Sequence, residues 1–326
     1  MKRLTVFLMI LAISLTSLIS CESNKEKEYT LHLGVTTSVN EGSGKVSETV
    51  AAVVTDSDGK IVQCRIDVIE FEAKIDNRGD PIASKPLTKH EQGDDYGMDK
   101  NPYVENTAGE WYKQAEYFEK FVEGMTLGEV KEIAFLESGK PADTDLVAGC
   151  TIAATDLKDA VVKALEGTNK YTFSAKGEIT SAVSAIGTTE ISYAKSGEAE
   201  DPTKPIFAFQ TDFAAVVSAK GRVASAAIDS IEVKLEYTVS EENTLVLEGV
   251  TDRGTKFELG DSYGMAIYDP ENTAGEWYKQ AEAVAKGAVG YETKKLSVYS
   301  EDLVAGCTMY AGGYKAALTK AADSVR

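Results

Sequence analysis

Apolar residues along this chain first follow a strand-like period and then a helix-like period, and the succession occurs twice. Alternating apolar positions over residues 46–55 and 60–76 predict two strands joined by a turn. The same pattern returns over residues 207–218 and 222–239, followed by a further strand at 244–250. Runs of this length, bounded by Gly, Asp and Ser, are typical of antiparallel hairpins.

A helical period follows each set of strands. Trp111, Ala115, Phe118 and Val122 lie at i, i+4, i+7 and i+11, which places them on one face of a helix. The second occurrence has the same spacing, with Trp277, Ala281, Val284 and Ala288. We interpret both tryptophans as core residues rather than as residues that stack on a cofactor.

A closing helix is predicted after each tryptophan helix, at 156–165 with Thr155 as its N-cap and at 313–322. Strands followed by helices predict an α+β fold, with helices packed on an antiparallel sheet in each of two tandem repeats.

Three stretches show that the chain is an internal duplication. The longest is identical over twelve residues and the shortest differs at one of six positions. Identity of this length indicates a repeated structural unit. The repeated stretches are 93–98 with 260–265, 105–116 with 271–282, and 145–151 with 302–308.

The duplication sets the expected boundaries. Residues 29–166 form the first repeat and 170–326 the second, and we expect each to fold alone. A change of parity in the second strand predicts a β-bulge near Val68. The stretch 196–205, rich in Gly, Pro and acidic residues, is predicted to be a loop of the second repeat.

The first twenty residues have the features of an export signal. Lys2 and Arg3 precede an apolar run that ends in Leu-Ile-Ser-Cys, with Cys21 as the cysteine. This ending resembles the lipobox of bacterial lipoproteins, which implies that 1–20 is removed and that Cys21 carries lipid. Residues 21–28 are polar and are expected to be a tether. The alternative is an ordinary secretory signal.

Composition excludes several classes of function. The formal charge is −18, and removal of Lys2 and Arg3 with the signal would take it to −20, so nucleic acid is not expected as a partner. The only two histidines, His32 and His90, lie outside the repeated stretches. A zinc site or a Ser-His-Asp triad common to both repeats is therefore not expected, and no metal site is predicted.

The remaining cysteines and aromatic residues leave alternatives open. Cys64, Cys150 and Cys307 are odd in number, and we favour free thiols over a disulfide. Tyr96 and Tyr263 each lie in a Gly-x-x-Tyr-Gly turn and are the aromatic residues that we place beside a ligand in preference to the tryptophans; the alternative is that they pack over the turn. The identity of the loops, while the strands differ, favours a common site or a demanding backbone geometry. Uneven divergence after a recent duplication is the alternative.

The heptapeptide Asp-Leu-Val-Ala-Gly-Cys-Thr resembles the Asp-x-x-Ser/Thr-Gly-Ala-Thr flavinylation motif of the FMN-binding domain family, which occurs in sodium-pumping NADH:quinone oxidoreductase and related electron-transport complexes. The resemblance implies FMN attachment by a flavin transferase through a phosphoester to Thr151 and Thr308. Alanine replaces Ser/Thr and cysteine replaces alanine here. The other motif positions are Asp145, Asp302, Gly149 and Gly306.

Two hypotheses of different classes follow. The first is a lipid-anchored protein of the cell envelope, outside the cytoplasm, with two FMN-binding-like domains. It would act as an electron carrier with redox partners and without turnover of its own. There, unpaired N–H groups near each modified threonine would receive the phosphate, and Tyr96 and Tyr263 would stack on the flavin. The second is a cofactor-free surface lipoprotein for ligand binding or adhesion. A hydrolase is disfavoured because no nucleophile–base pair is repeated.

Overall fold

The structure is a computed structural model that describes residues 25–101, 107–268, 270–271, 273–299 and 307–325. Cys21, Asp302 and Gly306 lie outside the described residues, as does the expected export signal. Within the described part of the chain, no helix has both the length and the apolar character needed to cross a membrane.

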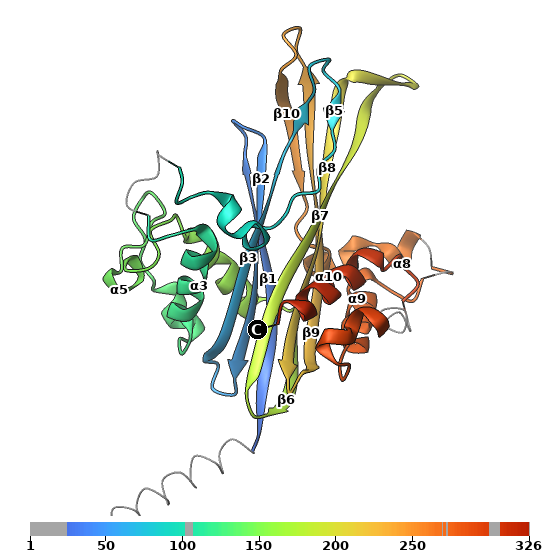
Figure 1. Cartoon of the computed structure of the whole chain (residues 1–326). Helices are drawn as coiled ribbons and strands as arrows, with labels where there is room; N and C mark the ends of the chain where they lie inside the picture. Colours follow the sequence, from blue (N-terminus) through green and yellow to red (C-terminus); the bar gives the residue numbers. More distant parts are fainter. Residues whose placement is uncertain (1–24, 102–106, 269, 272, 300–306, 326) are drawn as a thin grey trace, which may run out of the picture.

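Two four-stranded antiparallel sheets pack face to face, and helices cover the outer face of each sheet (Figure 1). The α+β class expected from the sequence is confirmed. The first sheet has the order β3-β2-β1-β6 and the second has the order β10-β9-β8-β7. The strands are β1 (Glu26–Asn40), β2 (Lys45–Asp56), β3 (Ile61–Glu72), β6 (Lys170–Lys176), β7 (Ile179–Ser196), β8 (Ala199–Ala219), β9 (Arg222–Val239) and β10 (Leu245–Asp252), with a small hairpin of β4 (Lys74–Ile75) and β5 (Pro81–Ile82).

Helices follow the strands in both halves of the chain. The two tryptophan helices and the two closing helices occur as expected. The helices are α2 (Lys89–Gln92), α3 (Trp111–Val122), α4 (Leu127–Lys131), α5 (Thr144–Val147), α6 (Thr155–Glu166), α7 (Lys256–Leu259), α8 (Met265–Tyr268), α9 (Trp277–Gly287) and α10 (Gly312–Asp323), with 3-10 turns η1 (Gly93–Tyr96), η2 (Gly260–Tyr263) and η3 (Thr293–Tyr299).

The central strands are apolar on both faces because each face meets a different layer. In β2, Val50 and Val54 face the other sheet, whereas Ala51 and Val53 face the helices, and all four are fully buried. Such a strand has a nearly continuous apolar run rather than strict alternation.

The same layering corrects the β-bulge that we expected near Val68. Pairing between β2 and β3 runs without interruption through Val68, and the shift lies between Val54 and Thr55, opposite the extra residue Val62. Cys64, Ile66 and Val68 face the helices, while Ile69 and Phe71 face the second sheet. The change of parity in the sequence therefore marks a change in which face is apolar, not a break in the strand.

The central core belongs to both halves of the chain. Phe71 of β3 stacks on Phe209 of β8 with ring centroids 4.9 Å apart. Strand β6, from the segment expected to begin the second repeat, pairs with β1 and completes the first sheet. The division at 167–169 remains a prediction about the repeated sequence, but the sheets and the core do not divide there. Independent folding of the halves is therefore no longer expected.

Three local expectations were also wrong. Strand β1 begins at Glu26, so part of the expected tether is strand, where pairing with β6 satisfies its backbone. Helix α6 begins at Thr155 and has Ala154 at its N-cap, with no side-chain cap. The expected loop at 196–205 is instead largely the end of the long β7–β8 hairpin. Charged strand residues at this exposed end resemble loop residues in composition.

Candidate functional site

The repeated stretches meet around one buried glutamine in each half. Gln114 of α3 is fully buried, and its Oε1 accepts hydrogen bonds from the Thr151 N–H at 2.7 Å and the Thr151 hydroxyl at 3.1 Å. Its Nε2 donates to the Gly109 carbonyl at 2.6 Å and to Thr107 Oγ1 at 2.9 Å. The amide thus joins two loops to the helix.

Gln280 of α9 makes the same contacts in the second half. Its Oε1 accepts from the Thr308 N–H at 2.8 Å and from the Thr308 hydroxyl at 3.2 Å. Its Nε2 donates to the Gly275 carbonyl at 2.8 Å and to Thr273 Oγ1 at 2.9 Å. All four bonds of the first network recur here, and the Met309 N–H adds one more to Gln280 Oε1 at 3.1 Å, so the identical sequences specify closely similar local geometry.

A buried glutamate at the start of each tryptophan helix fixes the tyrosine turn. The Glu110 carboxylate accepts from the N–H groups of Met98 at 2.8 Å and Asp99 at 3.0 Å. Glu276 does the same for Met265, at 2.9 Å, and for the residue after it. The two carboxylates pair the equivalent N–H groups in both halves, which gives a structural reason for the identity of these loops.

The repeated aromatic residues have structural roles as well. Trp111 and Trp277 are buried, 4% and 1% exposed, as expected for core residues. The tyrosines that follow them donate hydrogen bonds to the acidic residue of the glycine turn, Tyr112 to Asp94 at 3.2 Å and Tyr278 to the equivalent residue at 3.3 Å.

The two threonines of the flavinylation-like motif do not present free N–H groups. Both N–H groups are paired with a glutamine, and each threonine lies four residues before a closing helix begins. The hydroxyls are engaged too, since Thr151 Oγ1 accepts from the Ala108 N–H at 3.1 Å and Thr308 Oγ1 from the Ala274 N–H at 2.9 Å. The N–H groups of the two threonines themselves are therefore not available to a phosphate.

Asp145 and Gly149 lie around the side chain of Tyr117. Asp145 is exposed on α5, and its carbonyl accepts from the Tyr117 hydroxyl at 3.0 Å. A Cβ at Gly149 would lie 2.2 Å from the Tyr117 ring, so the residue must be glycine because of close approach rather than because of a left-handed turn.

One pair of predicted site residues does meet in a pocket. Tyr263 and Thr308 line the same cavity of about 470 Å³ in the second half. Arg253 also lines it, and sequence reasoning missed this residue because its position in the first half is Pro86. The other lining residues are Glu232, Met265, Tyr268, Thr273 and Met309.

In the first half, Tyr96 is packed much as Tyr263 is in the second. Each ring lies against the helix-side core with a lysine ammonium near it, Lys89 at 5.2 Å from the Tyr96 centroid and Lys256 at 5.8 Å from the Tyr263 centroid. The residues around the two rings differ. Ile152 takes the place of Met309, and there is no arginine at the Arg253 position. The chemistry of the second-half pocket is therefore not reproduced around Tyr96.

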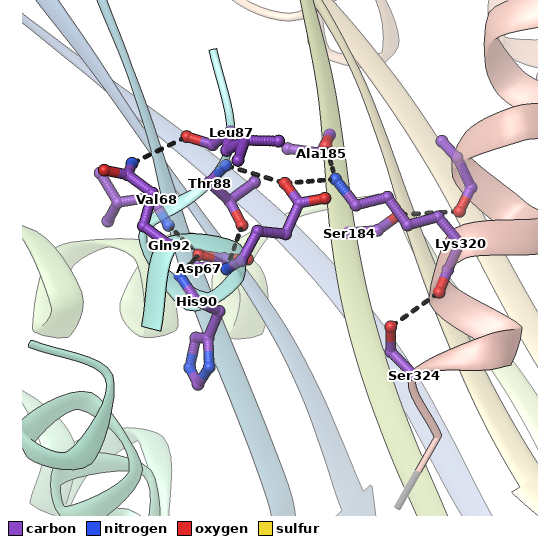
Figure 2. A network of polar contacts seen from close by, with 12 residues as sticks. Asp67, Val68, Leu87, Thr88, His90, Gln92, Ser184, Ala185, Lys320 and Ser324 are labelled. Carbon is purple, nitrogen blue, oxygen red and sulfur yellow. Dashed lines mark hydrogen bonds and ion pairs between the residues drawn. The ribbon is translucent and has the colours of Figure 1, made fainter. Parts of the chain in front are cut away.

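A buried aspartate holds the short helix before each tyrosine turn, and sequence reasoning missed it (Figure 2). Asp67 Oδ1 accepts from the N–H groups of Val68 at 2.8 Å and His90 at 3.1 Å. Burial raises the pKa of Asp67 to about 6 and that of its counterpart Asp229 to about 7. The repeated Ile-Asp-x-Ile-Glu pattern was the available signal.

The three cysteines in the described residues have no arrangement that suggests a disulfide, a catalytic thiol or a metal site. Cys64, Cys150 and Cys307 are free thiols. Burial raises the pKa of Cys150 to about 11, which keeps it protonated and unreactive near neutral pH. Within the described ranges, no three side chains of His, Cys, Asp or Glu are grouped to hold a metal ion.

Comparison with known proteins gives no relative to extend this description. No family model, no curated protein and no solved structure matches the chain.

Proposed function

We propose that this chain is an exported, lipid-anchored protein of the cell envelope that binds FMN in the second-half pocket and carries electrons without turnover of a substrate. The observation that carries the proposal is the meeting of Tyr263, Thr308 and Arg253 in one cavity. Its volume, about 470 Å³, lies in the range of small-ligand sites.

The pocket residues fit an aromatic, anionic cofactor. The Arg253 guanidinium supplies the positive charge that a phosphate requires, because the threonine N–H groups are already paired. Tyr263 offers a ring for offset stacking, and the methionine side chains offer apolar contact. FMN bound there would supply reversible redox chemistry, while these side chains would orient it.

Covalent attachment is proposed for Thr308 alone. Thr308 lines the cavity and its N–H donates to Gln280, so esterification would remove only the hydroxyl donor of that pair. The FMN-binding-like fold, the flavin transferase and the redox partners belong to the same proposal. Its support is the motif resemblance together with this pocket.

The rim of the same pocket supports a second candidate, a cofactor-free protein that binds an apolar or aromatic ligand at the cell surface. Tyr268 lines the cavity and is 89% exposed, and Ile267 beside it is 77% exposed. Tyr310, next to the lining residue Met309, is 90% exposed. Exposed apolar residues near a pocket are typical of binding sites.

FMN binding distinguishes the two candidates. The full chain is taken from the membrane fraction of a host with a flavin transferase. It should show flavin absorbance, and a peptide containing Thr308 should carry the FMN mass. In the Thr308→Val variant the adduct should be lost, whereas the matched Thr151→Val variant should keep it. A Cys21→Ser variant should leave the membrane fraction.

Titration of flavin-free protein tests the role of the arginine. Arg253→Ala should weaken FMN binding at least tenfold and leave binding of riboflavin, which has no phosphate, nearly unchanged. A chain with no adduct and no affinity for free FMN would refute the electron-carrier proposal and leave the cofactor-free candidate.

A further inference from the structure

The closing helix of the first half carries a short segment on its outer side that the second half does not have. This covering segment, residues 133–142, lies between α4 and α5. It forms a tight turn in which Phe135 pairs with Pro141. The Gly139 carbonyl accepts from the Ala154 N–H, at the N-cap of α6, at 2.9 Å. The covering segment is thus ordered and held on the start of α6.

Two charged residues of α6 receive partners from this region. One is a lysine in the first turns of the helix, which lies over an aromatic ring, and the other is a glutamate in the last turn, which pairs with a lysine of α4. The Lys158 ammonium is 5.2 Å from the Phe135 ring centroid, and Glu166 forms an ion pair with Lys131. A cation at this distance from a ring centroid is attracted by the ring.

The second half lacks the covering segment. Val130 and Leu296 occupy equivalent positions, because both are fully buried and each follows by six residues a glycine whose N–H donates to a carbonyl at the start of β3 or β9. Between this position and the repeated heptapeptide there are 14 residues in the first half, 131–144, and five in the second, 297–301. The covering segment, and its aromatic residue with it, accounts for the difference.

An open groove runs along the outer face of α10, the equivalent of α6. Its volume is about 550 Å³, and its lining residues on α10 follow a helical period. Ser297 of η3 lines the other side and stands where the first half has Lys131. The helix residues of this α10 groove include Gly312, Lys315, Ala316, Thr319 and Asp323.

The α10 groove keeps the two charged groups that have partners in the first half. Lys158 corresponds to Lys315, and Glu166 corresponds to Asp323. Within the ranges that the structure describes, the side chains of Lys315 and Asp323 have no hydrogen bond or ion pair. The lysine and the carboxylate have therefore been retained, while the aromatic ring and the cation that they would contact have been lost.

Exposed apolar side chains flank the α10 groove. Val298, beside the lining residue Ser297, is 74% exposed, and Tyr310 lies near the start of α10 with its ring against Gly312. Tyr310 stands where the first half has Ala153, on which the covering segment packs. Large apolar residues exposed beside a groove are typical of sites that bind another protein.

The first half also indicates which chemistry the occupant should bring. It should supply an aromatic ring to Lys315 and a cation to Asp323. A second copy of this chain does not offer them from its covering segment, because Phe135 and Lys131 there already contact α6. The formal charge of −18 also disfavours a second copy and favours a basic partner.

We propose that the α10 groove is the docking site of a separate, basic protein, which inserts a tight turn bearing an aromatic residue and a lysine or arginine. The ring would lie over the Lys315 ammonium, and the cation would pair with the Asp323 carboxylate. This site is independent of FMN binding, because the groove shares no lining residue with the second-half pocket.

A peptide with the sequence of residues 131–142, acetylated and amidated, is a suitable probe, because it contains both Lys131 and Phe135. Titrated into the full chain and followed by NMR, it should bind saturably at concentrations up to about 1 mM, as expected for a flexible segment that is ordered on binding. Phe135→Ala in the peptide should weaken binding about tenfold, since the buried ring is lost. A scrambled peptide of the same composition should not bind.

Variants of the full chain test where the peptide binds. Ala316→Trp fills the groove from an exposed position and should abolish binding, whereas Asp159→Trp, the matched change on α6, should leave it unchanged. Asp323→Lys should weaken binding of the wild-type peptide severalfold and restore binding of a peptide with Lys131→Glu. An unfolding midpoint equal to that of the wild type verifies that each variant is folded.

Four outcomes would overturn the proposal. They are the absence of saturable binding, equal binding of the scrambled peptide, full binding to Ala316→Trp, and no rescue between Asp323→Lys and the charge-reversed peptide. A dimer of the full chain in sedimentation that Ala316→Trp dissociates would overturn it too, because a second copy would then occupy the groove.

Discussion

Substitution of Gln114 by alanine should destabilise the protein strongly, although the residue lies in no pocket. The side chain is fully buried and makes four hydrogen bonds to two loops. In Gln114→Ala the N–H and the hydroxyl of Thr151 lose their acceptor, whereas the Gly109 carbonyl and the Thr107 hydroxyl keep their hydrogen bond to each other.

The magnitude follows from the four hydrogen bonds that are lost. Each contributes about 0.5–1.5 kcal/mol net. Thr107, Gly109 and Thr151 are half-buried, so water partly replaces the amide and the lower half of that range applies. The expected loss in the free energy of unfolding is therefore about 3 kcal/mol.

Urea unfolding of the chain, followed by circular dichroism, measures this loss. Gln114→Met keeps most of the volume and should lose nearly as much stability as Gln114→Ala if hydrogen bonds dominate. Gln280→Ala should cost at least as much, because its network repeats these four bonds and adds one from the Met309 N–H. The exposed neighbour Lys113→Ala should change stability by less than about 0.5 kcal/mol. A loss below about 1 kcal/mol in both glutamine-to-alanine variants would refute this explanation of the repeated sequences.

Two further predictions concern the core between the sheets. When the two halves, residues 29–166 and 170–326, are expressed separately, neither should unfold cooperatively, because the central core and the first sheet contain residues of both halves. Cooperative unfolding of either half alone would contradict this. Burial raises the pKa of Glu48, which lies between the sheets, to about 8, so its stabilising effect is full below about pH 4.5 and lost as pH rises through about 8. Glu48→Gln should therefore flatten the fall in unfolding free energy between pH 5 and 9, and an unchanged slope would show that Glu48 does not cause it.

Local periodicity predicted those elements whose partners lie close in the sequence. The tryptophan helices and the β2–β3 and β8–β9 hairpins are examples. Each helix packs one apolar face on a sheet, and each hairpin pairs strands that are adjacent in the sequence. Strand β6 was not predicted as part of the first sheet, since its pairing with β1 joins residues about 140 positions apart. The parity change at Val68 was misinterpreted because a strand buried on both faces has no single apolar period.

The candidate sites show a similar limit. The sequence singled out Tyr263 and Thr308, which do line one pocket, but it could not show that the Thr308 N–H is paired with Gln280. Arg253 was missed because it has no equivalent in the first half. The cavity between strand β3 of the first half and strand β7 of the second could not be predicted from the sequence, because its walls come from strands and helices of both halves.

Sequence identity between the repeats therefore reflects the need to hold the loop backbone in one geometry more than a binding chemistry that the two halves share. Gln114, Glu110 and their counterparts are identical in the two halves because each pairs backbone groups that the loops must place in the same way. After the duplication, the residues free to change in either half are those that do not pair these backbone groups of the loops. Arg253 stands where the first half has Pro86, and Glu119 where the second has Ala285, and each lines a different cavity. Specific binding in this protein should therefore be sought at positions where the two halves differ.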